Sequence, residues 1–268
     1  MVIIASAYVI FTATAYLFPQ YFYYHPSSAK PDINEARSPG YPVQEVTFQS
    51  ADETKLYGWL TPPQPGQKMI IFFHGNAYDI SFISAKAQPF AERGYGTFLP
   101  EYRGFGGLKG DITEKNLAAD AAAAIKYLNS LGYKNEDIIV YGISLGSYLA
   151  TRVVHDLQSN GRFNALILEV PFDSLTKTAK DHVPFYIPDF IIRDKYDSAA
   201  LIKNIGTRLL IQAGGLDTLI PPAHAQNLFD QAIEPKTFKI YPHADHNNLL
   251  SFGNYNDIMA WLENKNNE

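Results

Sequence analysis

From residue 43 onward, short apolar runs alternate along the chain with stretches of mixed polarity. Continuous apolar runs are typical of strands buried on both faces, and strands are predicted at 68–73, 96–101, 138–140, 165–170, 208–213 and 237–241. Helical spacing of apolar positions or helix-competent composition predicts helices at 80–93, 113–131, 147–156, 223–233 and 254–263. An alternating pair of segments, 43–48 and 55–60, predicts a hairpin before them. Repeated strand–helix units predict a mostly parallel sheet with helices on both faces.

The N-terminal stretch Met1–Phe18 is almost wholly apolar. As a helix it nearly crosses a hydrocarbon core of about 30 Å, and the aromatic run Tyr21–His25 is typical of a membrane interface. We therefore predict a single-pass transmembrane anchor at residues 1–24. The proline-rich residues 25–42 are predicted to be a linker, and residues 43–268 a single domain.

Two alternatives to the anchor stay open. Ala13-Thr14-Ala15 would suit the cleavage site of a signal peptide, although the basic n-region of such a peptide is absent. A hydrophobic helix docked on the domain is the other alternative. Lys30 and Arg37 follow the span, which favours a cytoplasmic domain, but Asp32 lies beside them and the membrane side is left open.

Composition narrows the class of protein. The 268 residues are 46% hydrophobic, which suits one large globular domain with a full core. A net charge of -5 leaves no basic surface, so nucleic acid is not an expected partner. The absence of cysteine excludes disulfides, cysteine nucleophiles and thiolate metal sites.

The segment Gly142-Ile-Ser144-Leu-Gly146 carries the clearest chemical motif. A predicted strand precedes it and a predicted helix follows it, which is the context of a nucleophile elbow. Glycines two positions before and after the serine allow the tight turn that exposes its hydroxyl. The backbone N–H of Leu145 then points toward the oxygen that becomes negative during acyl transfer.

A serine nucleophile needs a base and an orienting carboxylate, and both are expected at the carboxyl ends of strands. Asp217 and His246 follow the strands 208–213 and 237–241. The order Ser144, Asp217, His246 is the one expected with a nucleophile elbow. Asp217 could instead be a turn residue and His246 an exposed loop residue. Competing candidates for the same roles are a base, His243, and two acids, Asp245 and Glu169.

His74-Gly75-Asn76 ends an earlier strand, and the backbone N–H of Asn76, or else of Ala77, is the expected second oxyanion donor. The segment from His243 to His246 also offers metal-ligating residue types, but too few convergent ligands for a metal site. The glycine-rich residues 104–107 lack dinucleotide-binding spacing and are predicted to form a turn near the site.

Residues 173–205 form a long insertion between two strands, rich in Phe, Tyr, Ile and Pro. Such a connection is often a lid or binding loop. The alternative is a small helical pair that seals the edge of the sheet.

Several segments together carry a family resemblance: His74–Ala77, Tyr102–Gly106, Glu114–Leu117 with Asp120, the elbow, Pro171-Phe172, Asp217 and His246. Over about residues 43–264 the chain resembles the alpha/beta-hydrolase superfamily. It is most similar to the membrane-anchored branch related to the depalmitoylating alpha/beta-hydrolase domain proteins. The resemblance implies an eight-stranded sheet, a short cap after strand six, and ester or thioester hydrolysis without a cofactor. It gives Ser144, Asp217 and His246 the roles of nucleophile, acid and base.

Two positions depart from the family pattern. Glu101 stands where the family usually has aspartate, and Gly107-Leu108-Lys109 lacks the usual serine after the glycine turn. Both lie in a loop beside the expected site, so they bear on substrate specificity more than on the reaction.

The first functional hypothesis is a membrane-attached serine hydrolase that acts on a small acyl or lipid-like ester or thioester. Its expected catalytic residues are Ser144, Asp217 and His246, with the amides of Asn76 and Leu145 as the oxyanion hole. One alternative is a serine peptidase, resembling an aminopeptidase, on the same fold. Another is a non-catalytic, membrane-tethered binding protein.

Overall fold

The computed structural model describes residues 23–36, 42–182 and 189–264, together with 6, 8, 12–14, 16 and 17. Within these residues no helix combines the length and apolarity that a bilayer span requires. Most of the predicted anchor at residues 1–24 lies outside the described residues, so the anchor stays a prediction. Tyr24, at the end of that range, is only 5% exposed and belongs to the core of the domain.

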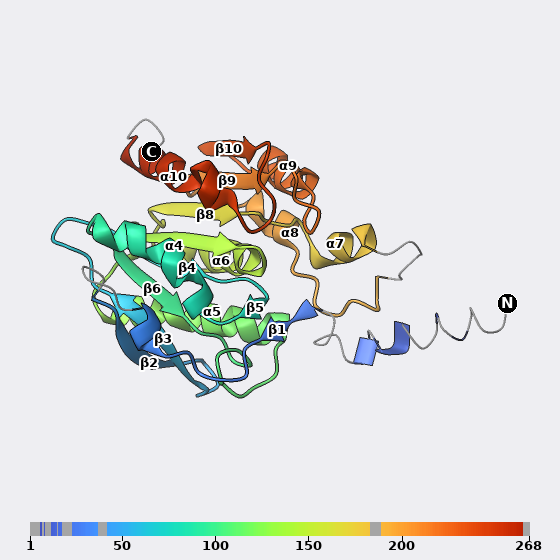
Figure 1. Cartoon of the computed structure of the whole chain (residues 1–268), viewed down its shortest axis with the longest axis horizontal. Helices are drawn as coiled ribbons and strands as arrows, with labels where there is room; N and C mark the ends of the chain where they lie inside the picture. The colour runs from blue at the N-terminus through green and yellow to red at the C-terminus, as the bar shows by residue number, and fades with distance from the viewer. Residues whose placement is uncertain are drawn as a thin grey trace.

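An eight-stranded sheet runs through the domain in the order β10-β9-β8-β7-β4-β6-β3-β2. Its strands are β2 (Gln44–Gln49), β3 (Lys55–Thr61), β4 (Met69–Phe73), β6 (Gly96–Pro100), β7 (Ile138–Ile143), β8 (Ala165–Glu169), β9 (Leu209–Gly214) and β10 (Lys236–Tyr241). The pairs from β10 to β6 are parallel, whereas β3 is antiparallel to both of its neighbours. In Figure 1 the arrows of β8 and β10 point to the end of the molecule where α7 and β1 lie.

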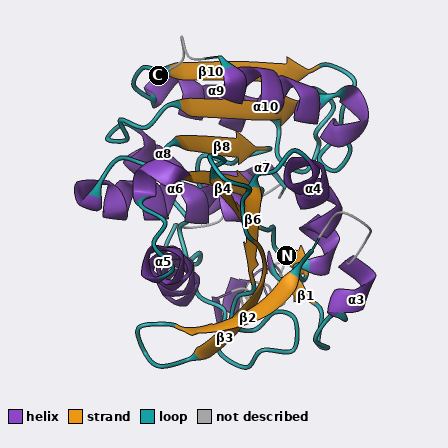
Figure 2. Ribbon diagram, turned by 90° about the vertical axis from the view of Figure 1, so that its left-hand side faces the viewer, coloured by secondary structure: helices purple, strands orange, loops and turns teal. Residues whose placement is uncertain are grey.

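Helices cover both faces of the sheet (Figure 2). They are α3 (Ile33–Ala36), α4 (Ser81–Glu92), α5 (Glu114–Ser130), α6 (Leu145–Leu157), α7 (Leu175–Asp181), α8 (Ser198–Ile202), α9 (Pro222–Gln231) and α10 (Asn254–Glu263), with short 3-10 turns at Asn135–Asp137, Gln158–Asn160 and Leu249–Phe252. One core joins the sheet to α5, α6, α8 and α9, and the other joins it to α3, α4 and α10.

The predicted mostly parallel sheet with helices on both faces is confirmed, and the predicted elements lie within a few residues of the observed ones. All residues of β4, β7 and β8 are buried, as continuous apolar runs indicate. Helix α5 begins where Thr113 accepts a hydrogen bond from the Asn116 amide (3.2 Å), so a side-chain cap fixes its first turn.

The first described part of the predicted linker packs on the domain. Strand β1 (His25–Pro26) pairs in parallel with the short strand β5 (Ala77–Tyr78). Farther along, Ala36 is 7% exposed and belongs to the core that contains α4 and α10. Prolines and mixed charge suggested a linker, but an irregular segment can still bury its apolar side chains. The division into anchor, linker and domain otherwise stays a prediction.

The insertion at 173–205 contributes α7 and α8 to the described structure, and residues 183–188 lie outside it. Helix α8 packs against α6 and α9. Helix α7 lies at the carboxyl end of the parallel strands (Figure 1). That the insertion acts as a lid stays a prediction.

Candidate active site

Ser144 occupies the turn between strand β7 and helix α6. Its backbone φ of 53° lies in the left-handed region, which is strained for a residue other than glycine. A Cβ atom on Gly142 would overlap the Gly146 carbonyl oxygen, and one on Gly146 would overlap the Phe73 carbonyl oxygen. The turn therefore requires both glycines. The Ser144 amide donates to the Glu169 carbonyl oxygen (3.0 Å), which ties the turn to β8.

The structure brings Ser144, Asp217 and His246 together. His246 Nε2 lies 3.1 Å from Ser144 Oγ, and His246 Nδ1 lies 2.7 Å from Asp217 Oδ2. The other carboxylate oxygen of Asp217 accepts hydrogen bonds from the amides of Leu219 (2.9 Å) and Ile220 (2.7 Å). With a proton on Nδ1 donated to Asp217, the imidazole presents a lone pair at Nε2 to the serine hydroxyl. This geometry suits removal of the hydroxyl proton during nucleophilic attack.

The competing candidates lie elsewhere. His243 and Asp245 are exposed on the loop that precedes His246. Glu169 is buried, but its carboxylate binds the Tyr141 hydroxyl and the Lys86 ammonium group. Burial of the phenol, together with the neighbouring charge of Glu169, raises the pKa of Tyr141 well above its usual value. Among the described residues, no group of three or more His, Asp or Glu side chains is arranged to hold a metal ion.

Both predicted oxyanion donors lie on elements beside Ser144. Leu145 is the first residue of α6, where a backbone N–H has no acceptor within the helix. Asn76 belongs to the loop of residues 74–80 that follows β4. This loop passes close to the nucleophile, because a Cβ on Gly75 would lie 3.6 Å from the Ser144 Cβ. That the two amides form an oxyanion hole remains a proposal.

The buried carboxylate of Glu101 binds both ends of the 74–80 loop. Glu101 Oε1 lies 2.8 Å from His74 Nε2, and Glu101 Oε2 accepts from the Ile80 amide (3.0 Å). Tyr102 stacks on the His74 ring at 4.1 Å. The sequence marks Glu101 only as a departure from the family's aspartate. Its acidic side chain directly after a strand was the available signal, but its partners lie 27 and 21 positions away.

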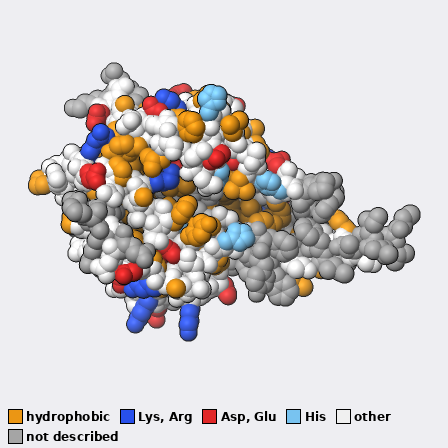
Figure 3. Space-filling view, viewed as in Figure 1, with side chains coloured by type: hydrophobic (Ala, Val, Ile, Leu, Met, Phe, Trp, Pro, Cys, Tyr) orange, Lys and Arg blue, Asp and Glu red, His pale blue; other side chains and the backbone are white. Residues whose placement is uncertain are grey.

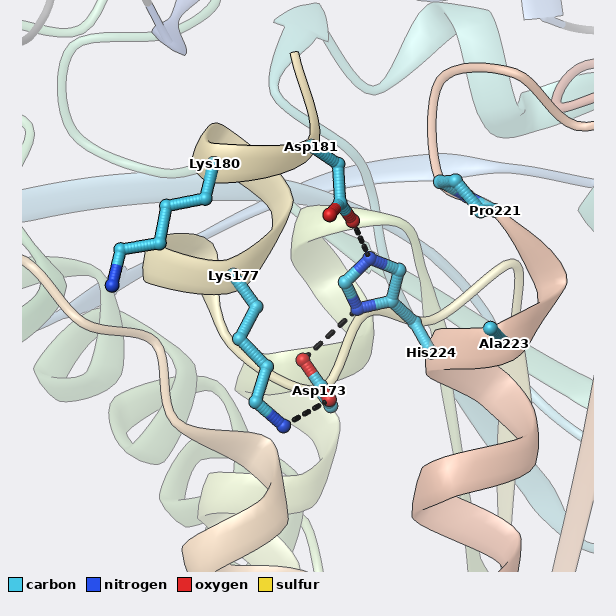
Figure 4. A pocket seen from close by; sticks show the side chains of 7 residues that line it. All are labelled: Asp173, Lys177, Lys180, Asp181, Pro221, Ala223 and His224. Atoms are coloured by element: carbon cyan, nitrogen blue, oxygen red, sulfur yellow. Dashed lines mark hydrogen bonds and ion pairs between the residues drawn. The ribbon is translucent and has the colours of Figure 1, made fainter. Parts of the chain in front are cut away.

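A second polar cluster joins α7 to α9 (Figure 4). His224 lies between two carboxylates, 2.9 Å from Asp173 and 2.8 Å from Asp181. Burial disfavours its charged form, but both carboxylates favour it more strongly and raise the pKa of His224. Burial likewise disfavours the charge of Asp173, yet hydrogen bonds from His224 and Lys177 lower the pKa of that carboxyl to about 2. No pattern in the sequence indicated this cluster.

The cluster borders an open cavity of about 290 Å³, lined by Asp173, Lys177, Lys180, Asp181, Pro221, Ala223 and His224. Helix α7 also reaches the loop that carries Asp217. His182 follows α7, and its Nε2 lies 2.7 Å from the Leu219 carbonyl oxygen. The insertion and the loop of the candidate acid are therefore in direct contact.

A mostly parallel eight-stranded sheet with a strained serine turn, and with an aspartate and a histidine after later strands, defines an α/β hydrolase. The model of the prolyl oligopeptidase family matches residues 80–268, more than half of the chain. The chain therefore belongs to the prolyl oligopeptidase family. It is also 31% identical over 209 residues to an uncharacterized protein of Mycobacterium tuberculosis, covering 76% of this chain and 72% of the relative.

Two further comparisons agree with this assignment. An uncharacterized membrane protein of Saccharomyces cerevisiae is 25% identical over 264 residues, covering 93% of this chain and 90% of the relative. The structure of the Pyrococcus furiosus esterase Pf2001 aligns with a TM-score of 0.71 at 17% identity, covering 90% of this chain and 96% of that one. The second likeness concerns the fold alone. Fold and family together support a serine hydrolase.

Proposed function

We propose that the protein cleaves acyl ester or thioester bonds, with Ser144 as nucleophile, His246 as general base and Asp217 as the orienting acid. The observation that carries the proposal is the imidazole of His246, which lies 3.1 Å from the Ser144 hydroxyl and 2.7 Å from the Asp217 carboxylate. These distances fall within the range that proton transfer and ring orientation require.

The proposed reaction has two halves. Ser144 Oγ attacks the acyl carbon while its proton moves to His246 Nε2, and the amides of Leu145 and Asn76 stabilise the oxyanion. The tetrahedral intermediate collapses as His246 gives that proton to the leaving alcohol or thiol, which leaves an acyl group on Ser144. Water then attacks the acyl group, its proton passes through His246 to Ser144 Oγ, and the carboxylic acid is released. Asp217 keeps the imidazole oriented through both halves of the reaction.

Exposed apolar side chains near the site favour a lipid-like acyl group. They lie in the 74–80 loop or directly after it, beside Asp217, and after His246: Tyr78, Phe82, Leu216, Leu219, Leu250 and Phe252. Each of these six side chains is between 43% and 58% exposed. Figure 3 shows hydrophobic side chains at the surface in this view. Large exposed apolar patches usually mark binding surfaces.

A membrane location is part of the proposal. The apolar stretch of residues 1–18 favours an anchor, and a relative of nearly the same length is described as a membrane protein. An anchor would hold the site near acyl chains in the bilayer. The resemblance to the depalmitoylase-like branch agrees with that substrate class.

Hydrolysis of p-nitrophenyl esters of increasing acyl length tests this function, with the Ser144→Ala variant as the control for catalysis at this site. We expect hydrolysis by the wild-type protein, a specificity constant that rises with chain length, and no turnover by Ser144→Ala. A flat response to chain length would contradict the lipid-like substrate. Folded wild-type protein without activity on any ester would contradict the hydrolase assignment.

Membership of the prolyl oligopeptidase family favours a second candidate, a serine peptidase that uses the same three residues. Its reaction differs in the leaving group, because His246 would protonate a departing amine. Fluorogenic aminoacyl amides distinguish the two functions. Amide cleavage as efficient as ester cleavage would favour the peptidase, and ester cleavage alone would favour the esterase. A non-catalytic binding protein would react with neither.

A further inference from the structure

The chain segment of residues 23–27 is hydrogen-bonded along the middle of the 74–80 loop. The His25 amide donates to the Asn76 carbonyl oxygen (2.9 Å), and the Ser27 amide donates to the Tyr78 carbonyl oxygen (3.0 Å). In the opposite direction, the Asn76 side-chain amide donates to the Tyr23 carbonyl oxygen (2.7 Å). Asn76 is therefore bound to the segment through both its backbone and its side chain.

A buried tyrosine fastens the same segment to the domain. Tyr24 is 5% exposed, and its ring meets Phe105 edge to face. The hydroxyl of Tyr24 lies 2.5 Å from the hydroxyl of Tyr196, which is fully buried. The Tyr196 amide in turn donates to Glu114 Oε2 (3.1 Å). The segment thus has a fixed position between the 74–80 loop and the end of the 173–205 insertion.

The loop needs support at this place. Glu101 binds its two ends, at His74 and Ile80. Its middle forms only the two-residue strand β5, and Tyr78 adopts a left-handed φ of 64°. A short strained strand keeps its conformation only where its surroundings fix it. The segment of residues 23–27 supplies that support from the outer side.

We propose that residues 23–27 are a positioning element of the active site, which fixes the direction of the Asn76 N–H toward the oxyanion. This inference rests on the proposed function. With its carbonyl and carboxamide groups both bound, Asn76 cannot rotate its backbone freely, so its amide is held in place before substrate binds. The apolar N-terminal stretch, which is the proposed anchor, then lies shortly before this positioning element in the chain, so the segments proposed for membrane attachment and for turnover are near neighbours in the sequence.

Two substitutions in the full chain remove different bonds. Asn76→Ala removes the carboxamide that binds Tyr23 but keeps the backbone N–H, and His25→Pro removes the amide that binds the Asn76 carbonyl. Both are expected to lower kcat for ester hydrolysis by about 10- to 100-fold with KM changed less than about twofold, because an oxyanion donor acts mainly in the transition state. The measurement is kcat and KM, together with the unfolding midpoint of each variant.

Asn135→Ala is the matched control. The Asn135 side chain also donates to distant backbone carbonyls, at Leu157 (3.2 Å) and Gly161 (2.9 Å), but it precedes β7 and lies at the opposite end of that strand from Ser144. The Asn135→Ala substitution should lower the unfolding midpoint and leave kcat unchanged.

Three results are decisive. A selective loss of kcat in Asn76→Ala and His25→Pro, at an unfolding midpoint no lower than that of Asn135→Ala, supports the inference. Folded variants whose kcat stays within about twofold of the wild type overturn it while the hydrolase function stands. If the wild-type protein hydrolyses no ester and a fluorophosphonate does not label Ser144, the proposed function itself fails. If either Asn76→Ala or His25→Pro does not fold, the kcat of the other variant decides between the first two results.

Discussion

Asp217 divides its two carboxylate oxygens between two tasks. One oxygen faces His246, and the other accepts the amides of Leu219 and Ile220 in the turn that follows. In the sequence, a turn role and a catalytic role are alternative explanations for Asp217. The structure shows that one aspartate can serve both. The turn fixes the carboxylate, and the carboxylate fixes the imidazole.

The substitution Asp217→Asn separates these tasks. Its amide oxygen still accepts from the turn, but the side chain no longer stabilises an imidazolium, so kcat should fall by about 1,000- to 10,000-fold. The free energy of unfolding should change by less than about 1 kcal/mol. Steady-state ester hydrolysis and urea unfolding measure the two quantities. A variant that retains most of its activity would exclude Asp217 as the orienting acid.

Gly146 offers a test of the serine turn. Gly146→Ala places a methyl group on the Phe73 carbonyl oxygen, so we expect a loss of more than about 4 kcal/mol in the free energy of unfolding. Gly206→Ala is the control, because a Cβ at that position meets open space. Equal stability of the two variants in thermal unfolding would show that the turn tolerates a side chain.

At the residue level, the sequence could predict which side chains lie together wherever reactive residue types follow strand ends, while the catalytic roles of these residues stay a prediction. Ser144, Asp217 and His246 each follow a strand, and parallel strands bring such positions to one edge of the sheet. The contacts of Glu101 and the use of the Asn76 side chain could not be predicted in this way. Each joins segments that are distant in the chain, and local sequence patterns carry no information on such pairs.

At the scale of elements, helix α7 is attached to the domain partly through charge. His224 contacts Asp173 and Asp181 with both ring nitrogens. Both nitrogens can donate only when the imidazole is protonated. We therefore expect the docking of α7 against α9 to depend on pH.

The direction of this dependence follows from the raised pKa of His224. The stabilisation is fully present below the ordinary histidine pKa of about 6.5 and is lost as pH rises through the higher pKa of the folded state. Urea unfolding between about pH 6 and about pH 9 should show a loss of stability in the wild-type protein that His224→Gln lacks. Parallel pH profiles of the two proteins would rule out this role.

The strands and helices themselves were predictable because buried elements place apolar residues at characteristic spacings along the sequence. Fully buried strands such as β4 and β7 are continuous apolar runs, and α5 carries an apolar stripe. Strand β1 has only two residues and no period of its own. It exists because β5 offers backbone partners, so the sequence alone indicates only a proline-rich connection there.

At the scale of the whole molecule, the N-terminal region contains both a proposed membrane anchor and a segment that contacts the active-site loop. Its first 18 residues favour a membrane anchor, and residues 23–27 lie on the loop beside Ser144. Composition could predict the first property because apolarity is local. It could not predict the second, since the burial of Tyr24 involves contacts with Phe105 and Tyr196, which lie far away along the chain.

The anchor proposal predicts where the protein is found in a cell. The full chain should stay with the membrane pellet after alkaline carbonate extraction, because an inserted apolar helix is held by the bilayer itself. Deletion of residues 1–18 should move the protein to the supernatant. Extraction of the full chain by carbonate would indicate peripheral attachment instead.

The central claim is that His246 makes the Ser144 hydroxyl nucleophilic, and covalent labelling by a fluorophosphonate measures it most directly. Mass spectrometry should find one adduct on Ser144 of the wild-type protein and none on Ser144→Ala. In His246→Ala, the adduct should form at least about 100-fold more slowly. Adduct formation at the same rate in His246→Ala, or folded wild-type protein that acquires no adduct on Ser144, would contradict the account.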